Sequence, residues 1–186
     1  LSWDAPANNG DAISDYVVKS CRGATCTEFV HEASPNTTIT VTGLSNGTIY
    51  TFKVAAKNAA GVGSEATSGG VTPRTVAGAP YNVAGTPGYR TVYFTWSAPV
   101  DTGGSAVTDY VIQSCIGNTC TTFTDAVSSA TSATVTGLTN GTGYTFQVAA
   151  VNAARTGGYS ARSSEVTPRT VPGIPTNATA VANNVG

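Results

Sequence analysis

The chain has 186 residues, a formal net charge of −1 and only 10% charged residues, whereas an average soluble domain has about 25%. Its nine lysines and arginines are scattered without a basic stripe, which argues against nucleic acid binding, and no apolar run approaches the roughly 20 residues of a membrane span. A hydrophobic content of 40% argues against disorder, and the 31 threonines and 21 glycines favour an all-β chain rich in turns.

Short segments with alternating apolar and polar side chains follow one another from the first residue. Such alternation, with turn residues about every 8 to 12 residues, predicts an antiparallel β-sandwich in which each sheet has one solvent-exposed face. In the first half of the chain the apolar positions are Leu1 and Trp3, then Tyr16, then Ile39 and Val41, and finally Tyr50, Phe52, Val54 and Ala56.

The second half of the chain repeats the first half. Tyr16–Ala60 aligns without gaps with Tyr110–Ala154 at an offset of 94 residues, with 28 of 45 positions identical. A unit of this length is typical of an independent domain rather than of a solenoid repeat. We therefore expect residues 1–75 to be a repeat that lacks its first strand, residues 76–170 to be a complete repeat, and residues 171–186 to be the opening strand of a third.

Several motifs in each unit resemble those of the fibronectin type III family. They comprise Trp-x-Ala-Pro at Trp3 and Trp96, Gly-Leu-x-Asn-Gly-Thr-x-Tyr at residues 43–50 and 137–144, then Val-Ala-Ala-x-Asn and a closing Val-Thr-Pro. The sequences of these motifs are similar to those of repeats in large secreted bacterial proteins. The resemblance covers essentially the whole chain and implies tandem immunoglobulin-like antiparallel β-sandwiches. It also implies that Tyr50 and Tyr144 are tyrosine-corner residues, whose hydroxyls bond to nearby backbone.

The family often presents ligands on the loop between its last two strands. That loop is expected at residues 58–68 and again at residues 152–162. The second of these carries residue types that are enriched at binding hot spots, and they form the candidate ligand-binding loop: Arg155, Tyr159 and Arg162. An ordinary exposed loop is the alternative.

Each unit contains one Cys-x4-Cys pair, Cys21 with Cys26 and Cys115 with Cys120. The enclosed residues include glycine and are expected to form a four-residue hairpin loop, which would place each pair across the strand ladder within reach of a disulfide. A zinc site and reduced thiols are the alternatives. One shared zinc site is disfavoured because the pairs lie 94 residues apart, in different domains. Disulfides would indicate an oxidising, extracellular setting.

Residues for catalysis are scarce. His31 is the only histidine, no Gly-x-Ser-x-Gly elbow accompanies it, and the acidic residues are too scattered to nominate a carboxylate pair. We therefore predict a protein that is not an enzyme, with no catalytic residue, no cofactor and no metal site.

The leading functional hypothesis is a structural repeat unit of an extracellular or cell-surface array or filament. An adhesion or ligand-binding module and a spacer region of a secreted polysaccharide-degrading enzyme are the alternatives. The expected partners are neighbouring repeats or subunits of the same protein, arranged head to tail, with a surface glycan or protein as a further candidate ligand. The linkers at residues 74–80 and 169–175 contain proline and should restrict domain movement.

The end of the chain repeats the start of the second unit. Residues 171–177 match residues 76–82, whereas no such segment precedes Trp3. An isolated first unit would therefore expose an unpaired strand edge. We expect residues near Ile174 to Val181 to form a strand of another sandwich, either in a continuous longer chain or by strand donation between subunits.

Overall fold

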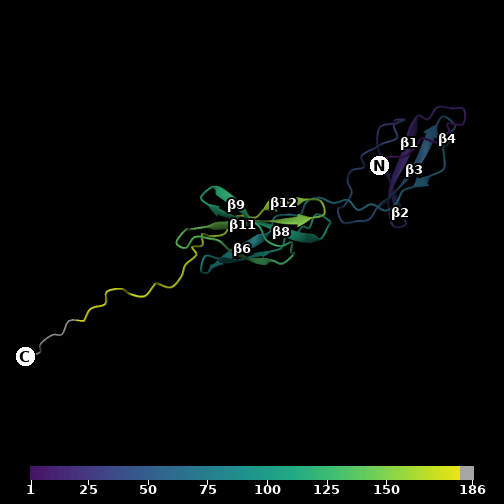
Figure 1. Ribbon diagram of the computed structural model, residues 1–186. Helices are drawn as coiled ribbons and strands as arrows, with labels where there is room; N and C mark the ends of the chain where they lie inside the picture. Colours follow the sequence, from purple (N-terminus) through teal and green to yellow (C-terminus); the bar gives the residue numbers. More distant parts are fainter. Residues whose placement is uncertain (181–186) are drawn as a thin grey trace, which may run out of the picture.

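The computed structural model describes residues 1–180. Within that range it contains twelve strands, all paired antiparallel, and no helix, so the predicted all-β class is confirmed. Two β-sandwich domains follow one another along the chain, with the N-terminus in the first domain and residues 171–180 leading away from the second (Figure 1). The described residues include no helix long and apolar enough to cross a membrane.

The second domain has two complete layers. One sheet has the strand order β10-β7-β6 and the other has the order β12-β11-β8-β9. The strands are β6 (Tyr81–Pro87), β7 (Val92–Ser97), β8 (Val107–Ile116), β9 (Thr119–Phe123), β10 (Ser132–Val135), β11 (Thr145–Asn152) and β12 (Thr156–Tyr159).

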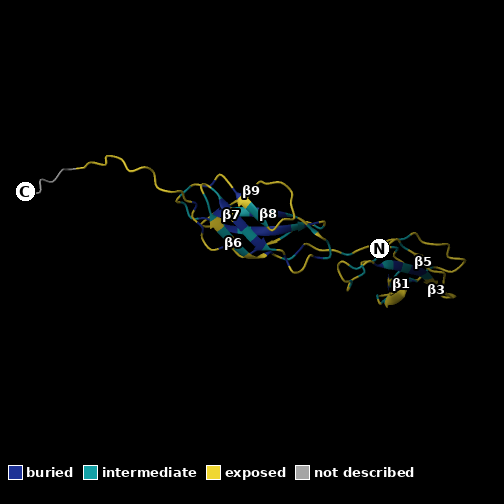
Figure 2. Cartoon of the chain, turned by 90° about the horizontal axis from the view of Figure 1, so that it is seen from below, coloured by how far each residue is buried: buried dark blue, intermediate teal, exposed yellow. Residues whose placement is uncertain are grey.

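The apolar side chains of the second domain meet between its two sheets. Phe94 from β7 and Phe146 from β11 are fully buried with ring centroids 5.4 Å apart, and Trp96 packs edge-on against Tyr110 at 5.1 Å. The interior of this domain is coloured as buried in Figure 2. The alternating apolar residues of this domain therefore form a closed core, because every second side chain of a strand points to the same face of the sheet.

The first domain has one regular sheet. Its strands are β1 (Asp15–Arg22), β2 (Thr25–Phe29), β3 (Thr51–Asn58), β4 (Gly61–Val62) and β5 (Ala66–Thr67). The order is β2-β1-β3-β4, and β5 also pairs with β3.

The opposite layer of the first domain is reduced to one bridge. Ser2 bridges to Thr38, and the predicted strands at Leu1–Trp3 and Ile39–Val41 do not extend beyond it. In the second domain β7 lies between two neighbours, β6 and β10. The first domain has no counterpart of β6 among its described residues, so the segment that corresponds to β7 is paired on one side only and the ladder stays short.

The tail, residues 171–180, leaves the second domain in an extended course (Figure 1). All ten residues are exposed, and none belongs to a strand. The strand expected near Ile174 to Val181 is therefore not formed by residues 174–180 within this single chain, and Val181 lies outside the described residues. Pairing with another sandwich remains a prediction.

Candidate functional site

The junction between the two domains is held by several hydrogen bonds. At its start, the Gly47 N–H in the first domain donates to the Pro73 carbonyl at 2.9 Å. Further along, the Thr75 N–H donates to the Gly103 carbonyl at 2.9 Å, and the Gly78 N–H donates to the Asp101 carbonyl at 2.8 Å. Hydrogen bonds therefore hold Pro73, just before the linker, to the first domain, and tie the linker itself, residues 74–80, to the second domain.

Asn152, at the end of β11, anchors the linker through its side chain. Its Nδ2 donates to the Thr75 carbonyl at 2.9 Å and to the Thr102 carbonyl at 2.8 Å, while its Oδ1 accepts from the Ala154 N–H. The residue is buried, so these bonds satisfy groups that water does not reach. The asparagine of Val-Ala-Ala-x-Asn was noticed in the sequence only as part of the family resemblance. Its role in holding the linker was missed, because the partner carbonyl lies 77 residues away.

Close backbone packing at the junction depends on glycine. A Cβ added to Gly104, whose φ is +80°, would overlap the backbone of Asn46 and Gly47 from the first domain, and a Cβ on Gly157 would overlap the Ala77 carbonyl oxygen. Ala77 itself is only 2% exposed and belongs to the core of the second domain. The linker is therefore part of the second domain's structure.

The cysteines form the two predicted disulfides, Cys21–Cys26 and Cys115–Cys120. Each pair faces directly across a hairpin, with Cα atoms 3.9 and 4.0 Å apart. The hairpin loop is shorter than the predicted four residues, because Arg22 also pairs with Thr25 and leaves only residues 23 and 24 in the turn. Gly23 makes this tight turn accessible through its φ of +60°.

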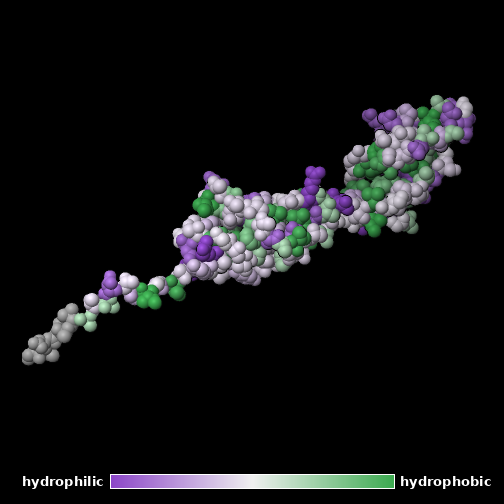
Figure 3. Space-filling view, in the orientation of Figure 1, coloured by the Kyte–Doolittle hydropathy of each residue, from purple (hydrophilic) through white to green (hydrophobic). Residues whose placement is uncertain are grey.

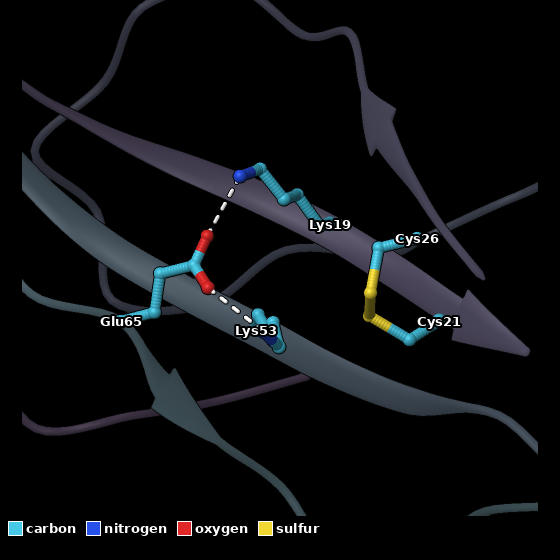
Figure 4. Close-up of polar contacts among 5 residues, drawn as sticks. All are labelled: Lys19, Cys21, Cys26, Lys53 and Glu65. Atoms are coloured by element: carbon cyan, nitrogen blue, oxygen red, sulfur yellow. Dashed lines mark hydrogen bonds and ion pairs between the residues drawn. A yellow bond between two sulfur atoms is a disulfide. The ribbon is translucent and has the colours of Figure 1, made fainter. Parts of the chain in front are cut away.

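A charged cluster lies near the first disulfide. Glu65 accepts from Lys19 on β1 at 2.7 Å and from Lys53 on β3 at 3.0 Å (Figure 4). The hydrogen bond from Lys19, and then that from Lys53, lowers the pKa of Glu65, while the bond to Glu65 raises the pKa of Lys19. In the second domain the lysine positions hold Gln113 and Gln147, which bond to each other at 2.7 Å. All of these side chains bridge two neighbouring strands of one sheet.

Tyr50 and Tyr144 occupy equivalent buried positions just before β3 and β11. The Tyr50 hydroxyl accepts from the Ser45 N–H at 3.1 Å, and the Tyr144 hydroxyl accepts from the Thr139 N–H at 3.1 Å. Each tyrosine thus ties the Gly-Leu-x-Asn-Gly turn to the strand that follows it.

The candidate ligand-binding loop contains a strand. Residues 156–159 form β12, and residues 61–62 and 66–67 of the corresponding segment form β4 and β5. Consequently Arg155, in the turn before β12, and Arg162, beyond its end, are not brought together. Arg162 donates to the Gly117 carbonyl and reaches Cys120 Sγ, while Tyr159 is 38% exposed. Sequence reasoning missed β12 because Gly157 and Gly158 are typical of loops, whereas here Gly157 makes room for the linker.

The titratable groups that could take part in catalysis lie apart or bond to the backbone. The two ring nitrogens of His31 contact the carbonyl oxygens of Glu32 and Tyr16 at 2.9 Å. Loss of hydration, and then the negative charge of Asp109, raise the pKa of Asp125, while Asp109 accepts from the Ser128 N–H. Residues 1–180 contain no cluster of three or more His, Cys, Asp or Glu that could hold a metal ion.

Comparison with known proteins places this arrangement in a family context. The family model of the fibronectin type III domain matches residues 1–70 and 78–166. The chain is 39% identical over 183 residues to Endoglucanase B of Cellulomonas fimi and 33% identical over 180 residues to Chitinase A1 of Niallia circulans. These matches cover 92% and 91% of the chain but only 17% and 23% of the two relatives. The chain therefore spans less than a quarter of either relative.

Among solved structures, domains A168–A170 of titin superpose with a TM-score of 0.56 at 23% identity, covering 82% of this chain and 54% of that one. At this level of identity the match shows a shared fold.

Proposed function

Because the chain belongs to the fibronectin type III family, we propose that it acts as a non-catalytic spacer that holds its neighbours in a secreted protein at a restricted distance and orientation. The observation that carries this proposal is the junction: the linker is hydrogen-bonded to the second domain, Ala77 is part of that domain's core, and Gly104 packs closely against Asn46 and Gly47 of the first domain. A linker of this kind limits the swing of one domain relative to the next, whereas a free Gly/Ser-rich coil would allow it.

The relatives support the spacer role over an array or filament. Endoglucanase B and Chitinase A1 carry names of polysaccharide-degrading enzymes, and the chain matches less than a quarter of each. The remainder of each protein leaves room for catalytic and binding domains, which a semi-rigid pair could keep apart. The two disulfides support a secreted location, because such bonds persist in oxidising compartments.

A ligand-binding role has less support from the side chains proposed for it. Arg162 donates to atoms of its own domain, and Arg155 lies in a different turn. Hot-spot residues act when they cluster in one desolvated patch, whereas Arg155 precedes β12 and Arg162 follows it.

Distance measurements between the domains test the spacer role. Spin labels would be attached through non-canonical amino acids at Glu28 and Thr122, exposed residues in β2 and β9, because all four cysteines are in disulfides. We expect a narrow distance distribution that broadens when residues 76–79 are replaced by Gly-Ser-Gly-Ser. Asn152→Ala should broaden it to a lesser extent, and Asn58→Ala, at the equivalent place in the first domain, serves as the matched control. A distribution as broad in the native chain as in the Gly/Ser variant would refute the proposal.

A further inference from the structure

The outer face of the β10-β7-β6 sheet presents two tyrosines to solvent. In β7 the side chains of Val92 and Phe94 are fully buried, so Tyr93 between them points away from the core, and it is 49% exposed. Tyr81, at the start of β6, is 46% exposed and pairs with Ser97 of β7. Because Ser97 is four residues beyond Tyr93, Tyr81 lies on the same outer face. Figure 2 shows β6 and β7 side by side in the second domain.

The positions around the tyrosines are mostly hydroxyl side chains. Thr86 of β6 and Thr134 of β10 pair with Tyr93 from either side, and both are exposed. Two residues further along β7, Thr95 pairs with Ser132 of β10. Tyrosine rings and small hydroxyl side chains thus share one surface. We call it the tyrosine face, and it consists of Tyr81, Thr86, Tyr93, Thr95, Ser132 and Thr134.

The two tyrosine rings are separated along the strand direction. Tyr81 lies opposite Ser97, and the four residues from Tyr93 to Ser97 span about 13 Å of extended strand. A single sugar or another compact molecule is too short to contact both rings. An extended chain molecule that runs along β7 can contact both.

The three strands that form the tyrosine face contain no charged residue. Neither Asp, Glu, Lys nor Arg occurs in β6, β7 or β10. In the first domain, by contrast, the sheet of β1, β2 and β3 carries charged side chains such as Lys19, Glu28 and Lys53. On the side of the chain seen in Figure 3, the strongly hydrophilic side chains form small separate groups rather than one continuous patch. An uncharged partner therefore matches the tyrosine face, because a charged one would lose its hydration without gaining an ion pair.

The composition of the tyrosine face also distinguishes between classes of partner. Tyrosine is common at protein–protein hot spots, but Ser and Thr are under-represented there, and they make up most of this face. Nucleic acids require cations to neutralise their phosphates. An uncharged polysaccharide matches both kinds of side chain, because the C–H groups of a pyranose ring pack against an aromatic ring and its hydroxyls bond to Ser and Thr hydroxyls.

We propose that the tyrosine face binds an uncharged β-1,4-linked polysaccharide. Chains with this linkage are extended and flat, whereas α-1,4-linked chains coil. One sugar ring packs on Tyr93 and another packs on Tyr81, while Thr86 and Thr134 bond to the hydroxyls of the ring on Tyr93. This binding surface is additional to the spacer role, and it would hold the second domain against the polymer.

Binding of the 186-residue chain to amorphous cellulose and to chitin tests the proposal. Both polymers are uncharged and β-1,4-linked, so the comparison also reports whether the N-acetyl group of chitin is accommodated. We expect saturable binding to one or both that persists in about 1 M NaCl, where interactions between surface charges are screened. Binding to neither polymer, binding that is lost in salt, or equal binding to starch granules, whose glucan is α-linked, would overturn the proposal.

Tyr93→Ser is the decisive variant, because it removes an outward-facing ring and should leave the circular dichroism unchanged. We expect about a tenfold loss of affinity, as for a binding hot spot. Tyr93→Phe keeps the ring and should bind like the native chain. Tyr159→Ser, in β12 of the other sheet, removes a tyrosine that is 38% exposed and is the matched control. Equal affinities of Tyr93→Ser and Tyr159→Ser would contradict the assignment of this face.

Tyr81→Ser tests the extended arrangement of the ligand. It should weaken binding as well, because the polymer then loses the second ring, and a Tyr81→Ser chain that bound as tightly as the native one would rule out contact with both tyrosines. The distance distribution between spin labels at Glu28 and Thr122 should stay unchanged in Tyr81→Ser and Tyr93→Ser. Failure of polysaccharide binding can therefore be told apart from failure of the spacer role.

Discussion

In the second domain Trp96 is 6% exposed, whereas its counterpart Trp3 in the first domain is only half-buried. The same contrast separates Phe94, which is fully buried, from Leu1, which is 37% exposed. The two domains share most of their motifs, and their tyrosine and tryptophan rings meet at similar distances and angles, 5.0 Å and 64° against 5.1 Å and 67°. Among residues 1–180 they differ in the linker and β6, which are present before the second domain's β7 and have no counterpart before Trp3.

This difference shows what the leading segment contributes. In the second domain it supplies Ala77 and Val83 to the core and a second neighbour for β7. In the first domain the corresponding core cluster has only Tyr16, Val18 and Val54 as buried members, and Trp3, Ile39 and Val41 around them are only partly buried. Burial of apolar surface is the main stabilising term in folding, so we expect the second domain to be the more stable one.

Truncation of matched core positions should reveal this contrast most strongly. Phe94→Ala removes a fully buried ring and should destabilise the second domain by about 3–5 kcal/mol. Leu1→Ala, at the equivalent position, should change the stability of the first domain by no more than about 0.5 kcal/mol. Urea unfolding followed by domain-resolved NMR signals measures both. Equal losses would mean that the two cores are equally closed.

Adding a methyl group at matched glycines should give a smaller effect. Gly157→Ala places its Cβ against the Ala77 carbonyl, and overpacking of this kind costs about 1–3 kcal/mol. Gly63→Ala meets only an ordinary contact with the Ala56 carbonyl and should leave the first domain's stability nearly unchanged. Thermal unfolding of each variant against the native chain is the measurement, and a stability loss in Gly63→Ala as large as in Gly157→Ala would contradict the account.

The tyrosine hydroxyls should show where the domains are alike. Tyr50→Phe and Tyr144→Phe each remove one hydrogen bond to backbone at 3.1 Å, at an expected cost of about 0.5–1.5 kcal/mol. Because both rings are buried to a similar degree, the two losses should agree. Denaturant midpoints of the two variants provide the check, and a loss confined to one domain would show that the turns are held differently.

Acid–base titration should give the smallest effects, with opposite signs in the two domains. The bonds from Lys19 and Lys53 lower the pKa of Glu65, so its stabilising contribution is present above its unfolded pKa and is lost as the pH falls through its folded pKa. The pKa of Asp125 is raised. The second domain therefore loses stability at this site as the pH rises from the unfolded pKa of Asp125 through its folded pKa.

Glu65→Gln should therefore abolish the loss of first-domain stability at low pH. Asp125→Asn should abolish the loss of second-domain stability with rising pH. Carboxyl NMR titrations, with unfolding measured across the same pH range, follow both groups. The same direction of shift for the two carboxylates would contradict this assignment.

Much of this architecture could be predicted from the sequence, because alternation, turn residues and an internal repeat are local or self-evident signals. The spacing of Cys21 and Cys26 is sufficient to predict that they face each other across a hairpin. The junction could not be predicted in the same way. Asn152 bonds to a carbonyl 77 residues away, and the need for glycine at position 157 comes from the approach of Ala77 in space. From the sequence, Gly157 and Gly158 instead indicate a loop, because glycine occurs both in turns and where two backbones approach closely.

Whether the linker is a built-in part of the second domain is tested most directly by ¹⁵N relaxation of the backbone amides. We expect order parameters of about 0.85 for Thr75, Ala77 and Gly78, equal to those of the sheets, and markedly lower values for residues 171–180 of the tail. Order parameters below about 0.6 in the linker, similar to those of the tail, would contradict the account.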